Sequence, residues 1–474
     1  MDIAETLMRI LLINPVARRT RGYHNSSQAF PPLGLQVLAQ LTPPGHEVDL
    51  VDEALGPIDT DNLLQKSRYD LVGITAMTSG ATRAYELAGQ CRVRGIPCIM
   101  GGPHAWAMPD EAARFFDAIT LGECDALWPT ILADAAAGKM QKRYQGEWVD
   151  LQRGYGRAQQ SLRPLNGRYS VNCLQTSRGC PVGCAYCSVT RFNGPKIRRR
   201  DVDDIVAEWN STEKGWLFVV DDNFFGVGPE QGAWAKGCLE AIIQRGKRRQ
   251  WFSQTTINMG TDPEALRLAY RAGCRAMLVG LESFDPENLR LCHKGINRSY
   301  AGRYKEMVDN FHRAGIAVFG AFIVGAERDT EDTAAQTALA AVETGVDIIQ
   351  ITNLTPLPGT PVYDDFLRAG RITACNYPQD WERYTFVETV FKPQRMEART
   401  LDATLLEVMY HAGRRHWPWR RSLKTLWRTR SLRTAIFVHV ANCGMRRIAR
   451  SLAPDDAIPP IPPERARKIK RAMT

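Results

Sequence analysis

Two stretches of the chain alternate short apolar runs with amphipathic stretches, and each predicts a parallel β-sheet. In residues 8–140, five near-continuous apolar runs, such as RILLIN and DLVGITAM, are each followed by a stretch with helical periodicity. Strands that are apolar throughout are buried on both faces, so this pattern predicts a doubly wound α/β domain over residues 1–145. A ligand of such a domain binds at the carboxyl ends of its strands.

The second alternation covers residues 170–365 and contains six β/α units. Six units are too few for a closed eight-stranded barrel, so we expect an open, partial (β/α)6 barrel of the TIM type with its mouth at the carboxyl ends of the strands. Two helices are expected to begin at Asp262-Pro263 and at Asp285-Pro286, because aspartate caps a helix and proline fits its first position.

Less regular segments join and follow the two alternations. Residues 146–169 are polar and rich in Gly, Arg and Gln, which predicts a linker. After the second alternation, helical periodicity returns near residues 396–416 and 431–451. Residues 366–474 are therefore predicted to form a helical C-terminal region.

Composition excludes several classes of protein. Hydrophobic residues make up 44% and charged residues 24% of the 474 positions, as in ordinary globular proteins. No run approaches the ~20 apolar residues of a membrane span, and Asp2 and Glu5 with no early basic cluster differ from a secretory signal. We therefore expect a cytoplasmic protein whose twelve cysteines stay reduced.

The strongest chemical signal is the CxxxCxxC run formed by Cys180, Cys184 and Cys187, which directly follows the first strand of the second alternation. Three thiolates on one short loop can hold three corners of a cubane iron–sulfur cluster and leave one iron open. A structural zinc site is the alternative, but it needs a fourth ligand. Cys173 is the nearest candidate, and its place in a strand pattern turns it away from the loop.

This motif, with the aromatic Tyr186 before its last cysteine, resembles the signature of the radical S-adenosylmethionine superfamily, and the resemblance extends over the whole partial barrel. It implies a [4Fe–4S] cluster whose open iron binds S-adenosylmethionine. It also implies S-adenosylmethionine contacts from the following residues: Tyr186, Asp221, Asp222, Glu282, Ser283 and Gly325.

Each of these carried-over contacts has a simpler alternative. The acidic pair Asp221-Asp222, expected to take the methionyl amine, could be an ordinary acidic turn. Glu282 is expected to reach the ribose or the amino-acid end of the cofactor. Gly325, expected to let the adenine approach closely, could equally serve a tight turn from strand to helix.

The N-terminal domain resembles the cobalamin-binding, flavodoxin- or Rossmann-like domain of one subgroup of that superfamily. The strings that carry this resemblance are Pro31–Leu35, Gly101–His104 and Leu121–Glu123, in that order. The cobalamin contacts that it implies are the following: Thr75, Ser79, Gly80, Gly101, Gly102, His104, Gly122 and Glu123.

One feature departs from many cobalamin proteins. The first loop, from Asn14 to Gln28, contains His24 but no Asp-x-His-x-x-Gly motif to ligate cobalt. This implies cobalamin held without that histidine, or a domain that has kept only the fold. A dinucleotide is the rival ligand, but no G-x-G-x-x-G follows the first strand. A loop histidine with a merely structural role is the alternative for His104.

Positive charge is concentrated in the C-terminal region. Residues 401–474 contain 16 Lys/Arg and 5 Asp/Glu, a surplus of +11 against +10 for the whole chain. Between Arg414 and Arg430, tryptophan alternates with arginine, as expected for a lipid interface at the inner membrane surface. The alternative is a solvated basic helix whose tryptophans pack on the barrel, and nucleic acid is not expected. Five prolines from Pro454 to Pro463 predict a mobile end.

The resemblance implies a cobalamin-dependent methyltransferase that acts on an unactivated carbon, through a 5′-deoxyadenosyl radical and methylcobalamin. Its substrate is expected to be a small or lipid-like molecule, and its electron donor a protein such as flavodoxin or ferredoxin. An oxidative cyclase or rearrangement enzyme with the same cofactors is the first alternative. An RNA-modifying radical enzyme and a metal-stabilised binding protein without activity are the others.

Overall fold

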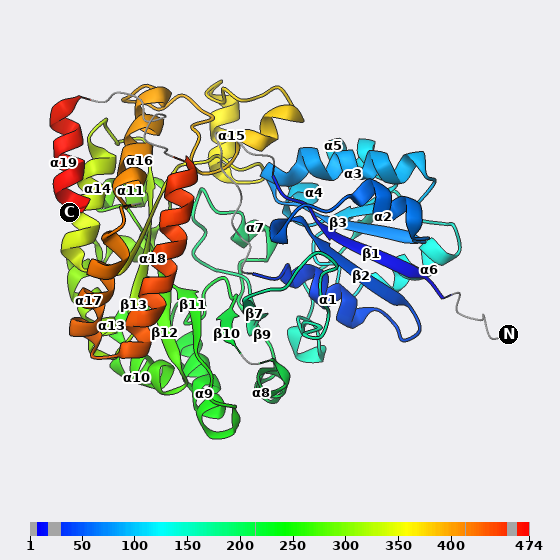
Figure 1. The fold of residues 1–474 in the computed structure, drawn as a ribbon, viewed down its shortest axis with the longest axis horizontal. Coiled ribbons are helices and arrows are strands. Elements are labelled where there is room, and N and C mark those ends of the chain that lie inside the picture. Colours follow the sequence, from blue (N-terminus) through cyan, green and yellow to red (C-terminus); the bar gives the residue numbers. More distant parts are fainter. Residues whose placement is uncertain (1–6, 18–29, 214, 413, 453–461, 474) are drawn as a thin grey trace.

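A computed structural model describes residues 7–473, except residues 18–29, 214, 413 and 453–461. Two six-stranded sheets, both parallel throughout, organise the molecule (Figure 1). The predicted α/β architecture is confirmed: a doubly wound N-terminal unit, an open six-stranded barrel and a helical C-terminal region. The domain boundaries given above stay predictions.

The first sheet has the strand order β2-β1-β3-β4-β5-β6, which is the flavodoxin-like order with one strand added. Its strands are β1 (Arg9–Asn14), β2 (Glu47–Asp52), β3 (Leu71–Thr75), β4 (Cys98–Gly101), β5 (Ala118–Leu121) and β6 (Arg143–Gln145). The short edge strand β6 was not among the five predicted strands, because only Tyr144 of its three residues is buried and the sequence shows no apolar run there.

Helices cover both faces of this sheet. One face packs against α1 (Leu33–Leu41) and α6 (Trp128–Ala136). The other packs against α2 (Thr60–Lys66), α3 (Ala81–Val93) and α5 (Pro109–Phe115). Short α4 (Pro103–Ala107) follows β4.

The second sheet has the order β7-β10-β11-β12-β13-β14 and does not close. Its strands are β7 (Val171–Leu174), β10 (Trp216–Val219), β11 (Trp251–Thr255), β12 (Cys274–Glu282), β13 (Ala317–Val324) and β14 (Ile348–Asn353). Its outer face packs against α8 (Val202–Ser211), α9 (Pro229–Arg245), α10 (Pro263–Arg271), α13 (Tyr304–Arg313) and α14 (Thr333–Thr344). The predicted caps form: Asp262 starts α10, and Asp285 starts α11 (Pro286–Leu291).

The cysteine motif lies between two short antiparallel strands, β8 (Ser177–Arg178) and β9 (Arg198–Arg199), and is followed by α7 (Val189–Phe192). Residues predicted as a linker pack along the first sheet: the amide of Leu165 donates to the carbonyl of Leu50 at 2.8 Å. The side-chain amide of Gln160, in the same segment, donates to the carbonyl of Cys173 in β7 at 2.8 Å, so the linker contacts both sheets.

After α15 (Pro361–Arg368), the C-terminal region forms α16 (Ala398–Ala412), α17 (Trp417–Thr429), α18 (Leu432–Leu452) and α19 (Pro463–Met473). Helix α18 crosses in front of the barrel sheet (Figure 1), and its Phe437 contacts Trp216 and Phe252 with ring centroids 4.9 and 5.2 Å apart. Since side chains alternate across a strand, these rings lie on the concave face, opposite α8–α14. Of the segment predicted to be mobile, residues 453–461 lie outside the described residues, and Pro463 begins α19.

Candidate functional site

The three motif cysteines lie on a loop that directly follows the carboxyl end of the first barrel strand. The Cys180 amide donates to the carbonyl of Gly194 at 3.1 Å, and the Ala185 amide to the carbonyl of Cys292 at 3.0 Å. The amide of Val362 in turn donates to the carbonyl of Ala185 at 3.0 Å. The rest of its own segment and segments that follow two other strands, β12 and β14, therefore fix the loop at the mouth of the barrel.

The donor set fits a cubane better than a single metal ion. Within the described parts of the chain, no three His, Cys, Asp or Glu side chains converge closely enough to hold one ion, and the motif thiols are no exception. Zinc requires such convergence, whereas a cubane takes each thiolate on a different iron. Burial raises the pKa of Cys180, and that of Cys187 to about 12, so these thiols keep their protons until a metal displaces them.

Asp221 and Asp222 hold the start of the cysteine loop. The fully buried Asp221 accepts hydrogen bonds from the amides of Thr176 at 2.7 Å and Ser177 at 3.1 Å, and from both hydroxyls. Asp222 accepts from the amide of Gly179 at 2.8 Å. Burial raises the pKa of Asp221 to about 6, against the effect of these bonds. The structure thus gives both carboxylates a positioning role that the sequence did not predict, and their contact with a methionyl amine stays a prediction.

A carboxylate and a cation lie together beside the cysteine loop. Glu282 ends β12 at a register shift, with φ at 65°, a backbone conformation that is strained for a residue other than glycine. Its carboxylate lies 3.3 Å from the ammonium of the buried Lys294. Burial alone lowers the pKa of Lys294, but Glu282 and the thiol of Cys184 outweigh it and hold this pKa above its usual value. The hydroxyl of Ser283, next in the chain, accepts a hydrogen bond from the backbone amide of Asp285 at 3.1 Å.

Lys294 was missed at the sequence level because it follows a short helix and belongs to no motif. The ion pair that it forms with Glu282 presents one fixed negative and one fixed positive group next to the thiols. Such a pair can bind the ammonium and the carboxylate of an amino acid at the same time.

Tyr186 and Gly325 differ in what they offer a ligand. The Tyr186 ring packs near Leu354 and Phe391, and its hydroxyl is buried beside the thiol of Cys184. Gly325 has φ at 94°, and a Cβ added there would lie 2.7 Å from the side chain of Leu401 in α16. The strand-to-helix turn and the close approach of α16 therefore explain Gly325 without a cofactor.

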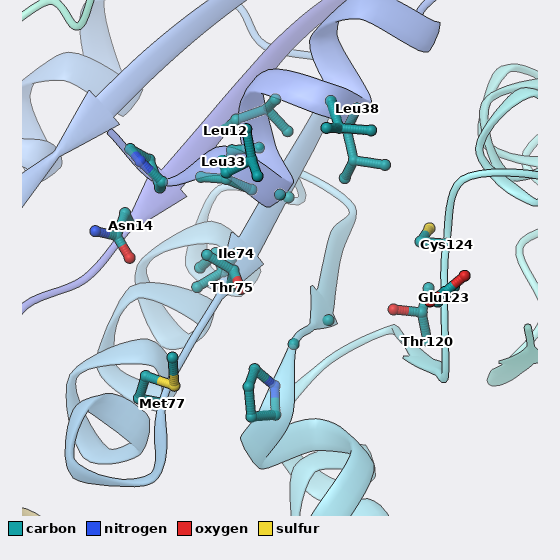
Figure 2. A pocket seen from close by; sticks show the side chains of 18 of the residues that line it. Leu12, Asn14, Leu33, Leu38, Ile74, Thr75, Met77, Thr120, Glu123 and Cys124 are labelled. Atoms are coloured by element: carbon teal, nitrogen blue, oxygen red, sulfur yellow. The ribbon is translucent and has the colours of Figure 1, made fainter. Parts of the chain in front are cut away.

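The N-terminal sheet forms a cavity of about 530 Å³ at the carboxyl ends of β1, β3, β4 and β5 (Figure 2). Seven of the eight predicted cobalamin contacts line it: Thr75, Ser79, Gly80, Gly101, Gly102, Gly122 and Glu123. Cys124, next in the chain to Glu123, also points into it (Figure 2). At Gly102, whose φ is 88°, a Cβ would meet the hydroxyl of Thr75 at 2.5 Å, so only glycine fits at this point after β4.

His104 is the eighth predicted contact, and the structure does not bring it to this cavity. Helix α4 begins at Pro103, which turns the fully buried His104 ring toward α3 and α5. There its Nε2 lies 2.9 Å from the hydroxyl of Tyr85, which donates to Glu111 at 2.7 Å. Trp381, which follows the barrel in sequence, also donates to Glu111, at 2.9 Å. His104 is therefore part of a network that holds the C-terminal region on the first domain.

The chemistry of the cavity fits a corrin. Its walls combine apolar side chains such as Leu12 and Ile74 with the hydroxyls and amides of Thr75, Thr120 and Asn14, which suit the amide fringe of the macrocycle (Figure 2). Among the described residues no histidine lines it, and His24 lies outside the described residues.

Two buried ion pairs connect the cavity to the cysteine loop. Glu123 accepts from Arg198 at 2.7 Å, and Asp125 accepts from Arg178 in a bidentate pair at 2.8 and 3.0 Å. Both arginines belong to β8 and β9, the strands that flank the cysteine motif, and Arg178 itself lines the cavity. The candidate cofactor sites are therefore fixed relative to each other by charge pairs that sequence spacing could not show.

Phe30 joins the cavity to the inside of the barrel. It lines the cavity, and its ring centroid lies 5.2 Å from that of Phe218 and 6.1 Å from that of Phe252, both on the concave face of the second sheet. One aromatic wall is thus shared by the N-terminal cavity and the barrel interior.

Comparison with known proteins gives two family matches and close relatives. The radical SAM superfamily model matches residues 174–341, and the B12-binding domain model matches residues 23–130. Bacteriochlorophyllide d C-8(2)-methyltransferase of Chlorobaculum tepidum is 30% identical over 420 residues, which cover 84% of this chain and 88% of that protein. The anaerobic magnesium-protoporphyrin IX monomethyl ester cyclase of Rubrivivax gelatinosus is 23% identical over 439 residues, covering 82% and 74%.

A solved structure shows the same fold. TsrM from Kitasatospora setae, a radical S-adenosylmethionine methyltransferase solved with cobalamin and a [4Fe-4S] cluster, superposes with a TM-score of 0.64 at 18% identity and covers 84% of each chain. The cysteine motif, the two matched regions and the extent of the 30% identical relative show that this chain belongs to the radical S-adenosylmethionine superfamily, in the group of enzymes that carries an N-terminal B12-binding domain.

Proposed function

We propose that this chain is a cobalamin-dependent radical S-adenosylmethionine methyltransferase that methylates an unactivated carbon of a small hydrophobic molecule. The observation that carries the proposal is the shared wall: the cavity is lined from both domains, and Phe30 connects it to Phe218 and Phe252 in the barrel. A methyl donor in the cavity and a substrate in the barrel would then be neighbours.

The proposed cofactor contacts follow from the geometry. Cys180, Cys184 and Cys187 would hold three irons of the cluster, and Glu282 with Lys294 would bind the ammonium and carboxylate of S-adenosylmethionine. When bound, these cofactors supply an electron, a hydrogen-abstracting radical and a transferable methyl group. The protein orients them: Asp221 and Asp222 fix the cysteine loop, and Arg178 and Arg198 fix that loop to the cavity.

The concave face of the barrel supports a hydrophobic substrate. Five aromatic side chains gather there, each only partly buried: Trp216, Phe218, Phe252, Phe319 and Phe437. Phe218 and Phe252 stack with centroids 4.8 Å apart and an interplanar angle of 6°. Aromatic surface that stays accessible inside a protein is suited to flat or apolar ligands.

An oxidative cyclase with the same cofactors is the second candidate, favoured by one observation: a relative that matches 82% of this chain is named as a cyclase. The RNA-modifying alternative gains nothing from the structure. Cys91 and Cys98 are buried in the core of the first domain and offer no second cluster loop.

Partner and location stay proposals. We propose a one-electron donor such as flavodoxin or ferredoxin, and a location in the cytoplasm with peripheral contact at the inner membrane surface. Of the helices that the structure describes, none is both long and apolar enough to span a bilayer.

The test uses the full chain, reconstituted anaerobically with iron, sulfide and cobalamin, then reduced and given S-adenosylmethionine labelled in its methyl group. Bacteriochlorophyllide d and magnesium-protoporphyrin IX monomethyl ester serve as substrate probes. A labelled methyl group in the product supports methyl transfer, and an unlabelled, cyclised product supports the second candidate. Absence of 5′-deoxyadenosine from the reduced, loaded enzyme would contradict both.

A variant sharpens this test at the proposed S-adenosylmethionine contact. Lys294→Met should keep the iron content but lower 5′-deoxyadenosine formation at least 100-fold, because it removes the cation that faces the thiols. Lys305→Met is the matched control, since Lys305 is exposed and pairs only with Asp309 on its own helix. If the two variants form 5′-deoxyadenosine equally fast, Lys294 does not contact S-adenosylmethionine.

A further inference from the structure

Helix α17 presents an apolar ridge to solvent. Trp419, Leu423 and Trp427 are four residues apart, so they share one face of the helix, and their exposed fractions are 63, 64 and 82%. Trp417, on the opposite side, is buried against the barrel helices. The sequence alternative in which the tryptophans pack on the barrel therefore holds for Trp417 alone.

Helix α18 carries a second ridge of the same kind. Leu432, Ile436 and Val440 are again four residues apart, with exposed fractions of 64, 52 and 65%. Only two residues separate the end of α17 at Thr429 from the start of α18 at Leu432, and Trp419, near the start of α17, contacts His439, with ring centroids 4.3 Å apart. The two helices therefore run antiparallel, and Trp419 lies beside the turn of α18 that carries Val440. Six exposed apolar side chains thus form one surface, which we call the hairpin face.

The two helices of the hairpin carry charged side chains of one sign only. Neither α17 nor α18 contains an Asp or a Glu. Exposed basic side chains adjoin the ridges: Arg420 and Lys424 on α17, and Arg433 and Arg447 on α18. Burial and the nearby Arg421, Arg420 and Arg428 together lower the pKa of Lys424, which reflects the mutual repulsion of these cations. An anionic partner would relieve it.

The hairpin is firmly attached to the barrel. Asp347, just before β14, accepts from the Thr425 hydroxyl of α17, and its carbonyl accepts from Asn442 of α18 at 3.2 Å and from Arg421 of α17 at 3.2 Å. On the inner side of α18, Phe437 contacts the aromatic rings of the concave sheet. The hairpin face is therefore the outer surface of the element that covers the barrel interior.

We propose that the hairpin face docks the enzyme on an anionic lipid bilayer, with its six apolar side chains in the interface and its arginines and lysine at the headgroups. Four of the six side chains are aliphatic. A nucleic acid is bound through positive charge and through stacking on aromatic rings, so it would leave the aliphatic side chains without a favourable contact. A second copy of this chain would set one basic face against another. The bilayer is the partner that satisfies both the apolar surface and the charge.

The consequence for catalysis rests on the proposed function. Docking through the hairpin face would place a source of hydrophobic substrate next to α18, the helix that covers the aromatic barrel interior. Lipid binding itself needs no turnover, so its measurement stands apart from the methyltransferase proposal.

The experiment measures flotation of the reconstituted full chain with vesicles of phosphatidylglycerol and phosphatidylcholine. Binding is expected to anionic vesicles, at least tenfold weaker to pure phosphatidylcholine, and weaker in high salt. Trp419→Ser with Trp427→Ser, and separately Arg420→Glu with Lys424→Glu, should each lower partitioning at least tenfold. Both pairs are exposed, so folding should be unaffected.

Matched controls change equally exposed residues of the N-terminal unit. Val93→Ser removes an 85% exposed apolar side chain from α3, and Lys66→Glu with Arg68→Glu reverses the same amount of charge; neither should alter partitioning. Any one of three results would overturn the proposal. The controls could lose as much vesicle binding as the hairpin variants, or the protein could show no preference for anionic vesicles. The third is that the hairpin variants keep lipid binding and instead lose RNA binding or dimer formation.

Discussion

The two candidate cofactor sites are built in opposite ways. The proposed cluster ligands come from eight consecutive residues, Cys180 to Cys187, and the fold only has to hold this loop in place. The N-terminal cavity takes its lining from residues between Leu12 and Asn193, which meet only because parallel strands end at one edge. The cysteine loop should therefore be most sensitive to the loss of one of its cysteines. The cavity should be most sensitive to the loss of residues that hold its walls in place.

Loss of one ligand should have the largest effect. Cys184→Ala should abolish bound cluster and all 5′-deoxyadenosine formation, measured as iron content and by EPR of the reduced protein, because two thiolates cannot hold the cubane. Cys173→Ala is the control: this thiol is buried inside β7, away from the loop. Full iron content in the Cys184 variant would refute the local site.

Loss of a support should come next. Arg198→Met leaves the buried Glu123 without its main partner, so the free energy of unfolding should fall by about 3 kcal/mol, measured by urea denaturation. Cobalamin binding should weaken with it, while iron content is kept. Arg143→Met, at an exposed pair with Asp110, should cost less than about 1 kcal/mol. Equal costs would mean that the interdomain pair is not a support.

The turn that contains Gly325 gives a test by pH. Burial raises the pKa of Asp329 to about 6 from 3.8, although its carboxylate accepts the amides of Gly325 and Ala326. The folded protein thus binds this proton more tightly than the unfolded chain, and the group destabilises the fold as pH rises from about 4 to 6. Asp329→Asn removes this titration, so the free energy of unfolding of the variant relative to that of the wild type should rise by up to about 3 kcal/mol between pH 4 and pH 7. Calorimetry at both pH values measures this, and an equal change at both would contradict it.

The smallest expected effect comes from a comparison within the first domain, between a side chain that lines the cavity and one that lies outside it. Thr75→Val removes a cavity hydroxyl and should weaken cobalamin binding about fivefold, the equivalent of about 1 kcal/mol. His104→Gln changes a side chain outside the cavity and should leave the cobalamin dissociation constant unchanged. Absorbance titration of the apoprotein compares the two. If the His104→Gln variant binds cobalamin more weakly than the wild type but is equally stable, His104 must contact the cofactor after all.

The sequence identified what depends on short-range pattern. Continuous apolar runs gave both parallel sheets, Asp-Pro pairs gave the starts of α10 and α11, and cysteine spacing gave the cluster loop and the family. Seven of the eight residues predicted to contact cobalamin line the cavity, because the carboxyl ends of parallel strands lie at one edge, and their contact with cobalamin stays a prediction. The eighth, His104, lies outside the cavity, because α4 begins at Pro103 and one helical turn decides which way a side chain points.

By itself, then, the sequence determined the fold class, the cysteine motif and the family, because periodicity and spacing act over a few residues. Only the tertiary structure decided that Lys294 faces the thiols, that Arg178 and Arg198 fix the loop to the cavity, and that six apolar side chains of α17 and α18 stay exposed. Contacts between residues far apart in sequence depend on how whole elements pack, and no local pattern encodes that packing.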